Sequence, residues 1–431
     1  MRENVFRGGI RPQDSKAYIG DYVHLLYEPA GDLVIPLTAG FGAKAKALVS
    51  VGDEVMVGQR LSECPQLPSL GAHSPCSGRI KAIERRETAS GITECIVLEN
   101  DRRFDLIDGV GAKIDWLELS RSDILSRIIE AGASGILPKR FPTAAKLDQL
   151  KPDSVSRIVV DGSGWEPVVT SDTDILRTRA YEVADGLKIL LRLFPGAAGV
   201  ILIGKDKEDT LDSVRDALRG AEGIKIKVVP AGQPTGSEKM IQSALSSIVP
   251  GSCKDICLVE TAAEAAAISD AVSRSTPFFR RIVTVAGSAV KNPGNFLVRI
   301  GTSCAELLAA AGGLRPGIKA ENAVLGGPLT GTALSTLDVP VLKDTTALLL
   351  FAEDEREKTE GECIRCGRCA DICPAGLLPM ELLKAARSGE IDKFEKLHGL
   401  DCISCGMCSW ACPSRQPLAE YLDCALAMLR K

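Results

Sequence analysis

Two cysteine motifs decide the fold of the last part of the chain: Cys363-x2-Cys366-x2-Cys369-x3-Cys373-Pro374 and Cys402-x2-Cys405-x2-Cys408-x3-Cys412-Pro413. Three closely spaced cysteines on a bent loop can bind three corners of an iron–sulfur cubane. The fourth ligand must come from elsewhere, because the chain has by then turned away. The proline after the last cysteine stops the loop and directs the chain outward. This spacing is the signature of two [4Fe–4S] clusters.

The spacing predicts that each motif supplies the fourth ligand of the other cluster. One predicted set of ligands is Cys363, Cys366, Cys369 and Cys412. The other predicted set is Cys402, Cys405, Cys408 and Cys373. The alternative is a pair of zinc knuckles, but zinc sites commonly use paired Cys-x2-Cys units and not two runs of four.

The segments around the motifs are also informative. Helices are expected at Pro379–Arg387 and Ile391–His398, between the two motifs. Upstream, residues 353–362 are almost wholly charged and predict a linker. Seven further cysteines are expected to be free thiols, because buried free thiols are common: Cys64, Cys76, Cys95, Cys253, Cys257, Cys304 and Cys424.

The composition limits the classes of function. The 431 residues carry a net charge of −4 and only 4% aromatic residues, which excludes a basic or base-stacking nucleic-acid surface. No run of about 18 uncharged apolar residues predicts a membrane span. The first twenty residues show no signal peptide, so the clustered cysteines indicate metal ligation in a reducing compartment.

The rest of the chain predicts two kinds of sheet. Short apolar runs separated by Gly, Pro and Asp make residues 30–110 all-β, similar to a lipoyl-type barrel-sandwich hybrid. Residues 61–78 contain no lysine, so a swinging arm is not expected. Residues 155–290 alternate between strand and helix patterns, which predicts a parallel α/β sheet. The strands expected there are Ser156–Asp161, Gly199–Gly204, Ile224–Pro230, Ile256–Thr261 and Arg281–Gly287.

This order of parts resembles the RnfC family, the peripheral subunit of Rnf ion-translocating ferredoxin:NAD+ oxidoreductases. The resembling motifs are Phe6–Pro12, Ile35–Leu37, Pro234–Lys239, Ala289–Gly313 and Gly326–Gly331. The resemblance implies a multidomain α+β fold in four parts. These are a barrel-sandwich hybrid (1–115), an α/β NADH/FMN-binding-like domain related to the complex I flavin subunit (116–275), a β-grasp soluble-ligand-binding module (276–350) and a helical two-cluster ferredoxin-like domain (351–431).

The resemblance also implies a nucleotide site for FMN and NAD(H). The family's phosphate loop, Gly-x-Gly-Gly-Ala-Gly-Phe-Pro-Thr, corresponds to Gly135-Ile-Leu-Pro-Lys-Arg-Phe-Pro-Thr143. Leu137 adds bulk where glycine lets a phosphate approach, and Pro138 removes a donor, while Lys139 and Arg140 could neutralise a phosphate by side chain. The contacts implied are Gly135, Lys139, Arg140 and Phe141 of this loop, with Gly162 and Glu166 of a second segment.

The function implied is electron relay between NAD(H) or flavin and ferredoxin-type partners, as part of an NADH/ferredoxin oxidoreductase complex. No catalytic side chain is predicted. The implied partners are membrane-embedded Rnf-type subunits, which would pump the ion, and a ferredoxin or flavoprotein. The implied location is the cytoplasm, peripheral on the inner membrane. Two alternatives remain: a soluble RnfC-like reductase component of another enzyme, and a wiring adaptor without nucleotide, which the altered loop favours.

Overall fold

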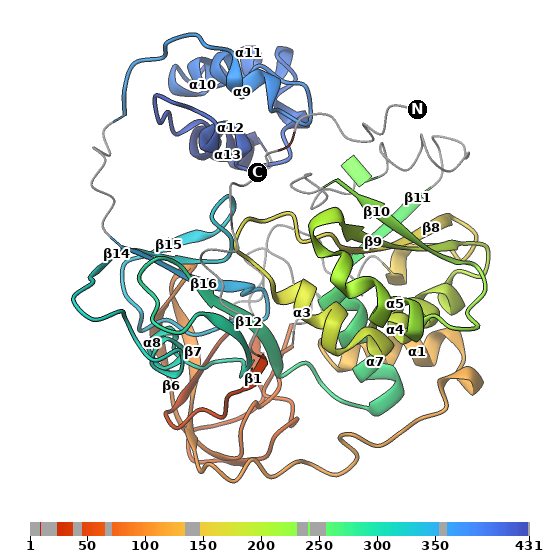
Figure 1. The fold of residues 1–431 in the computed structure, drawn as a ribbon. Helices are drawn as coiled ribbons and strands as arrows, with labels where there is room; N and C mark the ends of the chain where they lie inside the picture. Colours follow the sequence, from red (N-terminus) through yellow and green to blue (C-terminus); the bar gives the residue numbers. More distant parts are fainter. Residues whose placement is uncertain are drawn as a thin grey trace.

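The computed structural model describes residue 9 and residues 24–37, 45–64, 71–133, 147–230, 240–241, 256–352 and 360–429. Figure 1 shows an α/β unit and two β units side by side, with a helical C-terminal unit above them. The phosphate-loop residues Gly135, Lys139, Arg140 and Phe141 lie outside the described residues, and so does the Pro234–Lys239 motif.

The first unit is all-β and is built on two long strands. Its antiparallel sheet has the order β2-β7-β6-β4. The strands of its described residues are β2 (Leu33–Pro36), β3 (Lys46–Ala47), β4 (Glu54–Val55), β5 (Ser62–Glu63), β6 (Gly78–Thr88) and β7 (Gly91–Asn100). Alternating side chains of β2, Leu33 and Ile35, point into the core beside Ile96 and Leu98 of β7. This alternation is why a short apolar run here forms a half-buried strand.

The second unit is a four-stranded parallel sheet in the order β10-β9-β8-β11. Its strands are β8 (Val155–Gly162), β9 (Ala198–Gly204), β10 (Ile224–Val229) and β11 (Ile256–Thr261). Its helices are η4 (Trp116–Glu118), α1 (Arg121–Glu130), α3 (Ser171–Thr178), α4 (Ala180–Leu193), η5 (Lys205–Thr210), α5 (Leu211–Ala217) and α7 (Ala262–Arg274). Strand β8 is buried along nearly its whole length, as expected in a covered parallel sheet.

The strand order of this sheet has a switch point. The chain runs from β8 outward to β9 and β10, and then returns to the other side of β8 as β11. In open parallel sheets, ligands bind at such a switch point, outside the carboxyl ends of the strands. Gly162 ends β8, and Glu166 follows it, so both predicted residues lie at this end of the sheet.

The third unit is a six-stranded sheet in the order β1-β13-β12-β16-β14-β15. Its elements are β1 (His24–Leu26), β12 (Arg280–Ala286), β13 (Gly294–Arg299), α8 (Cys304–Ala310), β14 (Ala320–Leu325), β15 (Thr332–Leu334) and β16 (Ala347–Ala352). Two features differ from the sequence-based expectation. The strand at 281–287 is not part of the parallel α/β sheet, because it pairs with β13 and β16. The N-terminal strand β1 also joins this sheet and not the first unit.

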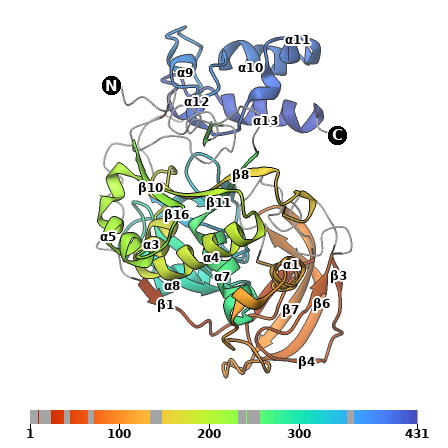
Figure 2. The ribbon, with the colours of Figure 1, turned by 90° about the vertical axis from the view of Figure 1, so that its right-hand side faces the viewer.

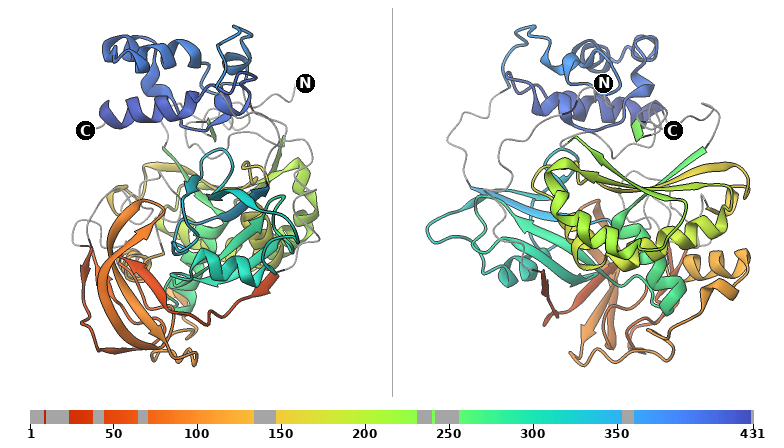
Figure 3. Two further views of the ribbon diagram at one scale, coloured as in Figure 1. Left: turned by 90° about the vertical axis from the view of Figure 1, so that its left-hand side faces the viewer. Right: turned by 45° about the vertical axis from the view of Figure 1, so that its right-hand side comes forward.

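The C-terminal unit is helical and packs around one small apolar core. Its elements are α9 (Arg368–Asp371), α10 (Pro379–Arg387), α11 (Ile391–Lys396), η6 (Gly399–Asp401), α12 (Met407–Trp410) and α13 (Leu418–Leu429). Figures 2 and 3 show it as a separate layer above the other units. The expected helix at Pro379–Arg387 is confirmed, and the one at Ile391–His398 ends at Lys396. Among the described helices, none combines the length and apolar character that a membrane crossing requires.

Candidate iron–sulfur sites

The two cysteine motifs form the same loop twice, 39 residues apart (402 − 363). Arg365 and Gly367 have left-handed backbones (φ 55° and 78°), and their counterparts Ser404 and Gly406 match them (φ 54° and 72°). The short helices α9 and α12 follow at the same offset. Non-glycine residues rarely adopt this conformation, so the tight curl at both loops indicates a functional constraint.

Backbone N–H groups point at sulfur in these loops. The Leu377 N–H donates to Cys373 Sγ and the Gln416 N–H donates to Cys412 Sγ, both at 3.4 Å. The Arg365 N–H donates to Cys363 Sγ at 3.4 Å. Hydrogen bonds to sulfur stabilise the charged thiolate and tune the potential of a cluster.

The structure brings Cys373 to the second motif. Cys373, Cys402, Cys405 and Cys408 line one cavity with apolar neighbours such as Leu377 and Leu422. Burial is the largest cause that raises the pKa of Cys405 and Cys408 to about 12, and neighbouring cysteines raise it further. Cys373 is one of these neighbours for both thiols. Because iron displaces the thiol proton when it binds, the four would act as thiolates in a cluster. We call this predicted ligand set the enclosed site.

The other four cysteines are more open. Cys363 and Cys366 are exposed, while Cys369 and Cys412 are partly buried. Burial raises the pKa of Cys369, and the nearby Cys412 adds to that shift. Cys412 therefore lies beside a cysteine of the first motif, as crossed ligation expects. We call Cys363, Cys366, Cys369 and Cys412 the open site, and both ligand assignments stay predictions.

The thiols fit a cubane better than a single ion. A zinc knuckle needs four ligands around one ion, whereas in a cubane each thiolate binds a different iron. The curled loops, the N–H groups aimed at sulfur and the shared apolar cavity are all features that a cluster would use.

The two described members of the predicted nucleotide site make internal contacts. A Cβ at Gly162 would lie 2.3 Å from Leu176 Cδ1, so this glycine allows α3 to pack against β8. Glu166 Oε2 accepts a hydrogen bond from the Leu329 N–H at 3.2 Å, and Oε1 accepts one from the Thr330 hydroxyl. Burial raises the pKa of the Glu166 carboxyl to about 7, although its hydrogen bonds oppose that shift. Glu166 thus joins the α/β unit to the loop that follows β14.

One buried cation at the carboxyl end of this sheet was not predicted from the sequence. The buried Lys207 follows β9 and donates from Nζ to the Gly164 carbonyl at 3.1 Å and to Asp206 at 2.9 Å. It therefore fixes the loop that carries Glu166. Its position directly after the expected strand Gly199–Gly204 was the available signal, since ligand contacts cluster at the ends of parallel strands.

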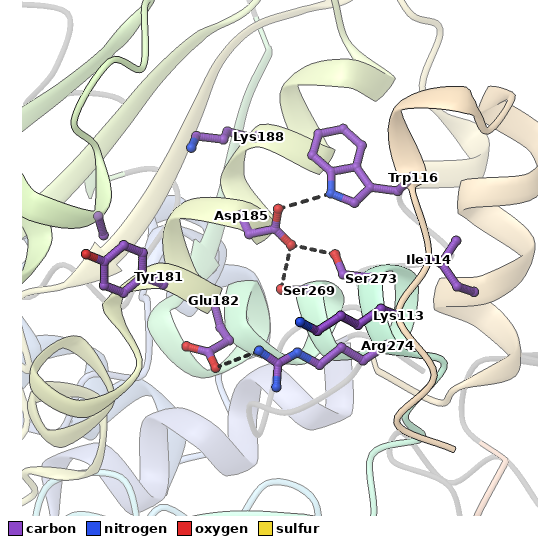
Figure 4. A pocket seen from close by; sticks show the side chains of 11 residues that line it. Lys113, Ile114, Trp116, Tyr181, Glu182, Asp185, Lys188, Ser269, Ser273 and Arg274 are labelled. Carbon is purple, nitrogen blue, oxygen red and sulfur yellow. Dashed lines mark hydrogen bonds and ion pairs between the residues drawn. The ribbon is translucent and has the colours of Figure 1, made fainter. Parts of the chain in front are cut away.

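A separate cavity lies between the segment before α1 and helices α4 and α7 (Figure 4). At its wall, Asp185 accepts hydrogen bonds from Trp116 Nε1 at 3.0 Å, Ser269 Oγ at 2.7 Å and Ser273 Oγ at 2.5 Å. Arg274 pairs with Glu182 at 3.6 Å. These contacts fasten the connecting segment to the helices, and the lining includes no residue from the carboxyl ends of the strands.

Family comparisons agree with this architecture. Four family models match in order: "RnfC Barrel sandwich hybrid domain" at 4–103, "Nuo51 FMN-binding domain" at 128–252, "SLBB domain" at 282–333 and "4Fe-4S dicluster domain" at 362–415. The multidomain fold class is thereby confirmed, and the last match indicates two [4Fe–4S] clusters. The division at residues 115, 275 and 350 stays a prediction.

Relatives that match most of this chain point the same way. The subunit designated C in the proton-translocating ferredoxin:NAD(+) oxidoreductase complex of Clostridium ljungdahlii is 32% identical over 385 residues, which are 88% of this chain and 83% of that protein. The subunits with the same letter in the ion-translocating oxidoreductase complexes of Haemophilus influenzae (strain PittEE) and Yersinia pseudotuberculosis are 35% and 36% identical over 96% of this chain. The alignments cover 65% and 60% of those two proteins, less than two thirds of their length. Because these relatives match nearly the whole of this chain, the chain belongs to the RnfC family of electron-transfer subunits.

Proposed function

We propose that the chain relays electrons through two [4Fe–4S] clusters between NAD(H) or flavin and a ferredoxin-type partner, as the RnfC component of an Rnf-type complex. The clostridial relative belongs to a ferredoxin:NAD(+) oxidoreductase complex, which supports this assignment. The clusters would supply one-electron chemistry, and the chain would supply their ligands, their hydrogen bonds and their docking.

One observation carries the proposal: Cys373 of the first motif shares a cavity with the cysteines of the second. Crossed ligation ties the two loops into one unit and keeps the clusters close, as sequential electron transfer requires. The open site has two exposed cysteines, Cys363 and Cys366, whereas the enclosed site faces the rest of the molecule. We infer that electrons pass to an external partner at the open site.

The α/β unit is the proposed nucleotide end of the relay. It matches the Nuo51 FMN-binding family over residues 128–252, and the strand order of its sheet has a switch point between β8 and β11. Lys139 and Arg140 would contact phosphate, with Gly135 and Phe141 in the same loop. The internal contacts of Gly162 and Glu166 favour a second candidate, an adaptor that receives electrons from a partner and binds no nucleotide.

We further propose that membrane-embedded Rnf-type subunits are the partners and carry out the ion transport. The chain would then lie on the cytoplasmic side of the inner membrane. A reductase component that serves another enzyme is the alternative for the whole protein. Co-purification with membranes favours the first assignment, and recovery away from membranes favours the second.

An anaerobic NADH titration of the iron-replete protein supplied with FMN tests the nucleotide end, because a flavin would accept the hydride of NADH and release its electrons singly to the clusters. We expect NADH to bleach the cluster absorbance and to produce the EPR signal of reduced clusters. The control is dithionite, which reduces both clusters whether or not NADH binds. Reduction by dithionite alone would contradict the nucleotide site and support the adaptor. Failure of dithionite to reduce two clusters would contradict the relay itself.

A further inference from the structure

Three units of the fold meet at one residue, Leu329, in the loop between β14 and β15. On one side, its N–H donates to Glu166 Oε2 of the α/β unit at 3.2 Å, while the adjacent Thr330 hydroxyl donates to Oε1. On the other side, its carbonyl oxygen faces the cluster loop, since a Cβ at Gly406 would lie 2.2 Å from that oxygen. Glu166 and Gly406, which directly follows Cys405 of the enclosed site, are thus two contacts of the same residue.

The carboxylate of Glu166 is held rigidly. Two residues later, Val168 has a left-handed backbone (φ 69°), which is strained for a β-branched residue. Packing in a cluster with Ala286, Ala347 and Leu349 keeps it there. On the other side, a Cβ at Gly327 would lie 2.2 Å from Glu166 Cδ, so the loop passes as close to the carboxylate as a glycine permits.

We propose that Glu166 is a positioning residue for the cluster of the enclosed site, and that it acts by orienting the Leu329 carbonyl against the Gly406 loop. The inference rests on the proposed function, because it needs both clusters. Reduction adds a negative charge to a cluster, and the negative end of a nearby carbonyl dipole disfavours that charge. Holding the Leu329 carbonyl in place therefore keeps the potential of this cluster low.

The open site provides an internal reference. Gly367 corresponds to Gly406 in the repeat, but none of the described atoms lies within 4 Å of where its Cβ would be. Loss of the Glu166 contact should therefore act on one cluster and leave the other unchanged. A purely structural defect would loosen the helical unit and affect both.

The test is an EPR-monitored redox titration of Glu166→Ala and Glu166→Gln in the full chain. The signal lost in Cys405→Ser identifies the enclosed cluster. In Glu166→Ala we expect the midpoint potential of that cluster to rise. At the potential where the wild-type cluster is half reduced, the ratio of reduced to oxidised cluster should be severalfold higher in the variant. Glu166→Gln should stay near wild type, because an amide oxygen still accepts the Leu329 N–H.

Two further variants keep the test decisive if Glu166→Ala folds poorly. Thr330→Val should raise the same potential, and Thr330→Ser, which keeps the hydroxyl, should restore it. Glu306→Ala is the matched control, because Glu306 accepts bonds from Tyr27 and the Ala30 N–H and belongs to α8, which lies away from the helical C-terminal unit (Figure 1). Equal shifts of both clusters, no shift, or a shift in Glu166→Gln as large as in Glu166→Ala would overturn the inference. An iron content below two clusters in the wild type would overturn the proposed function and the inference together.

Discussion

The two cysteine loops have the same spacing and backbone but different surroundings. In the open site, Cys363 and Cys366 are exposed. In the enclosed site, the cysteines line an apolar cavity, and Gly406 packs against the Leu329 carbonyl. The potential of a cluster depends on hydrogen bonds to sulfur and on solvent exposure. Two equal motifs can therefore give two unequal clusters, which an ordered relay requires.

Removing one thiolate from either loop should have the largest effect. Cys405→Ser should lose or convert the enclosed cluster and leave the open one, because a serine hydroxyl is a poor substitute for a thiolate. Cys366→Ser should do the reverse. Iron content and the EPR spectrum of the reduced protein measure both. Cys424→Ser in α13 is the control, since this exposed cysteine belongs to neither motif. Identical spectra for Cys405→Ser and Cys366→Ser would remove the distinction between the sites.

An alanine at the matched glycines isolates the effect of docking. Gly367→Ala and Gly406→Ala both place a side chain at positive φ, which costs roughly 1–2 kcal/mol. Only Gly406→Ala also drives a Cβ into the Leu329 carbonyl. We expect Gly406→Ala to lower the thermal midpoint and the iron content clearly more than Gly367→Ala. Equal losses in the two variants would show that the Leu329 contact contributes little.

The pH dependence of stability should show a smaller effect. Burial raises the folded-state pKa of Glu166 from 4.5 to about 7. Between these values the folded protein holds a proton that the unfolded chain has lost, so the free energy of unfolding falls as the pH rises. Glu166→Gln removes this titration. The melting temperature of this variant should therefore decline less than that of the wild type between about pH 5 and about pH 7.5, the range that spans the two pKa values of Glu166. The pKa of Asp172 is also raised, to about 6, so Asp172 contributes the same pH dependence to both proteins and does not affect their difference. Parallel curves for the two proteins would contradict the shift.

The sequence was sufficient where the signal is local. Cysteine spacing identified both motifs, and the helix expected at Pro379–Arg387 between them is α10. The strand at 281–287 was also recognised, but its assignment to the parallel sheet was wrong, because an apolar run does not say which sheet it joins. The same reason explains why β1 was not assigned to the third unit.

The sequence was insufficient where contacts are distant along the chain. Glu166 was predicted as a nucleotide contact on the strength of its motif, yet its hydrogen-bond partners lie 163 and 164 residues away. Gly162 was predicted for the same reason, and its packing against Leu176 depends on the path of α3. Neither contact could be predicted from the periodicity or the composition of the sequence. The loop containing Gly135, Lys139, Arg140 and Phe141 is outside the described residues, so these four stay predictions.

Crossed ligation is the central claim, and Cys373→Ser tests it most directly. Cys373 belongs to the first motif by sequence but lies beside Cys405 and Cys408 in the structure. The measurement is the EPR-monitored redox titration of Cys373→Ser, compared with those of Cys405→Ser and Cys366→Ser. We predict that Cys373→Ser alters the same cluster signal as Cys405→Ser and preserves the one lost in Cys366→Ser. Loss of the Cys366 signal instead would mean that each motif holds its own cluster, and the crossed assignment would be wrong.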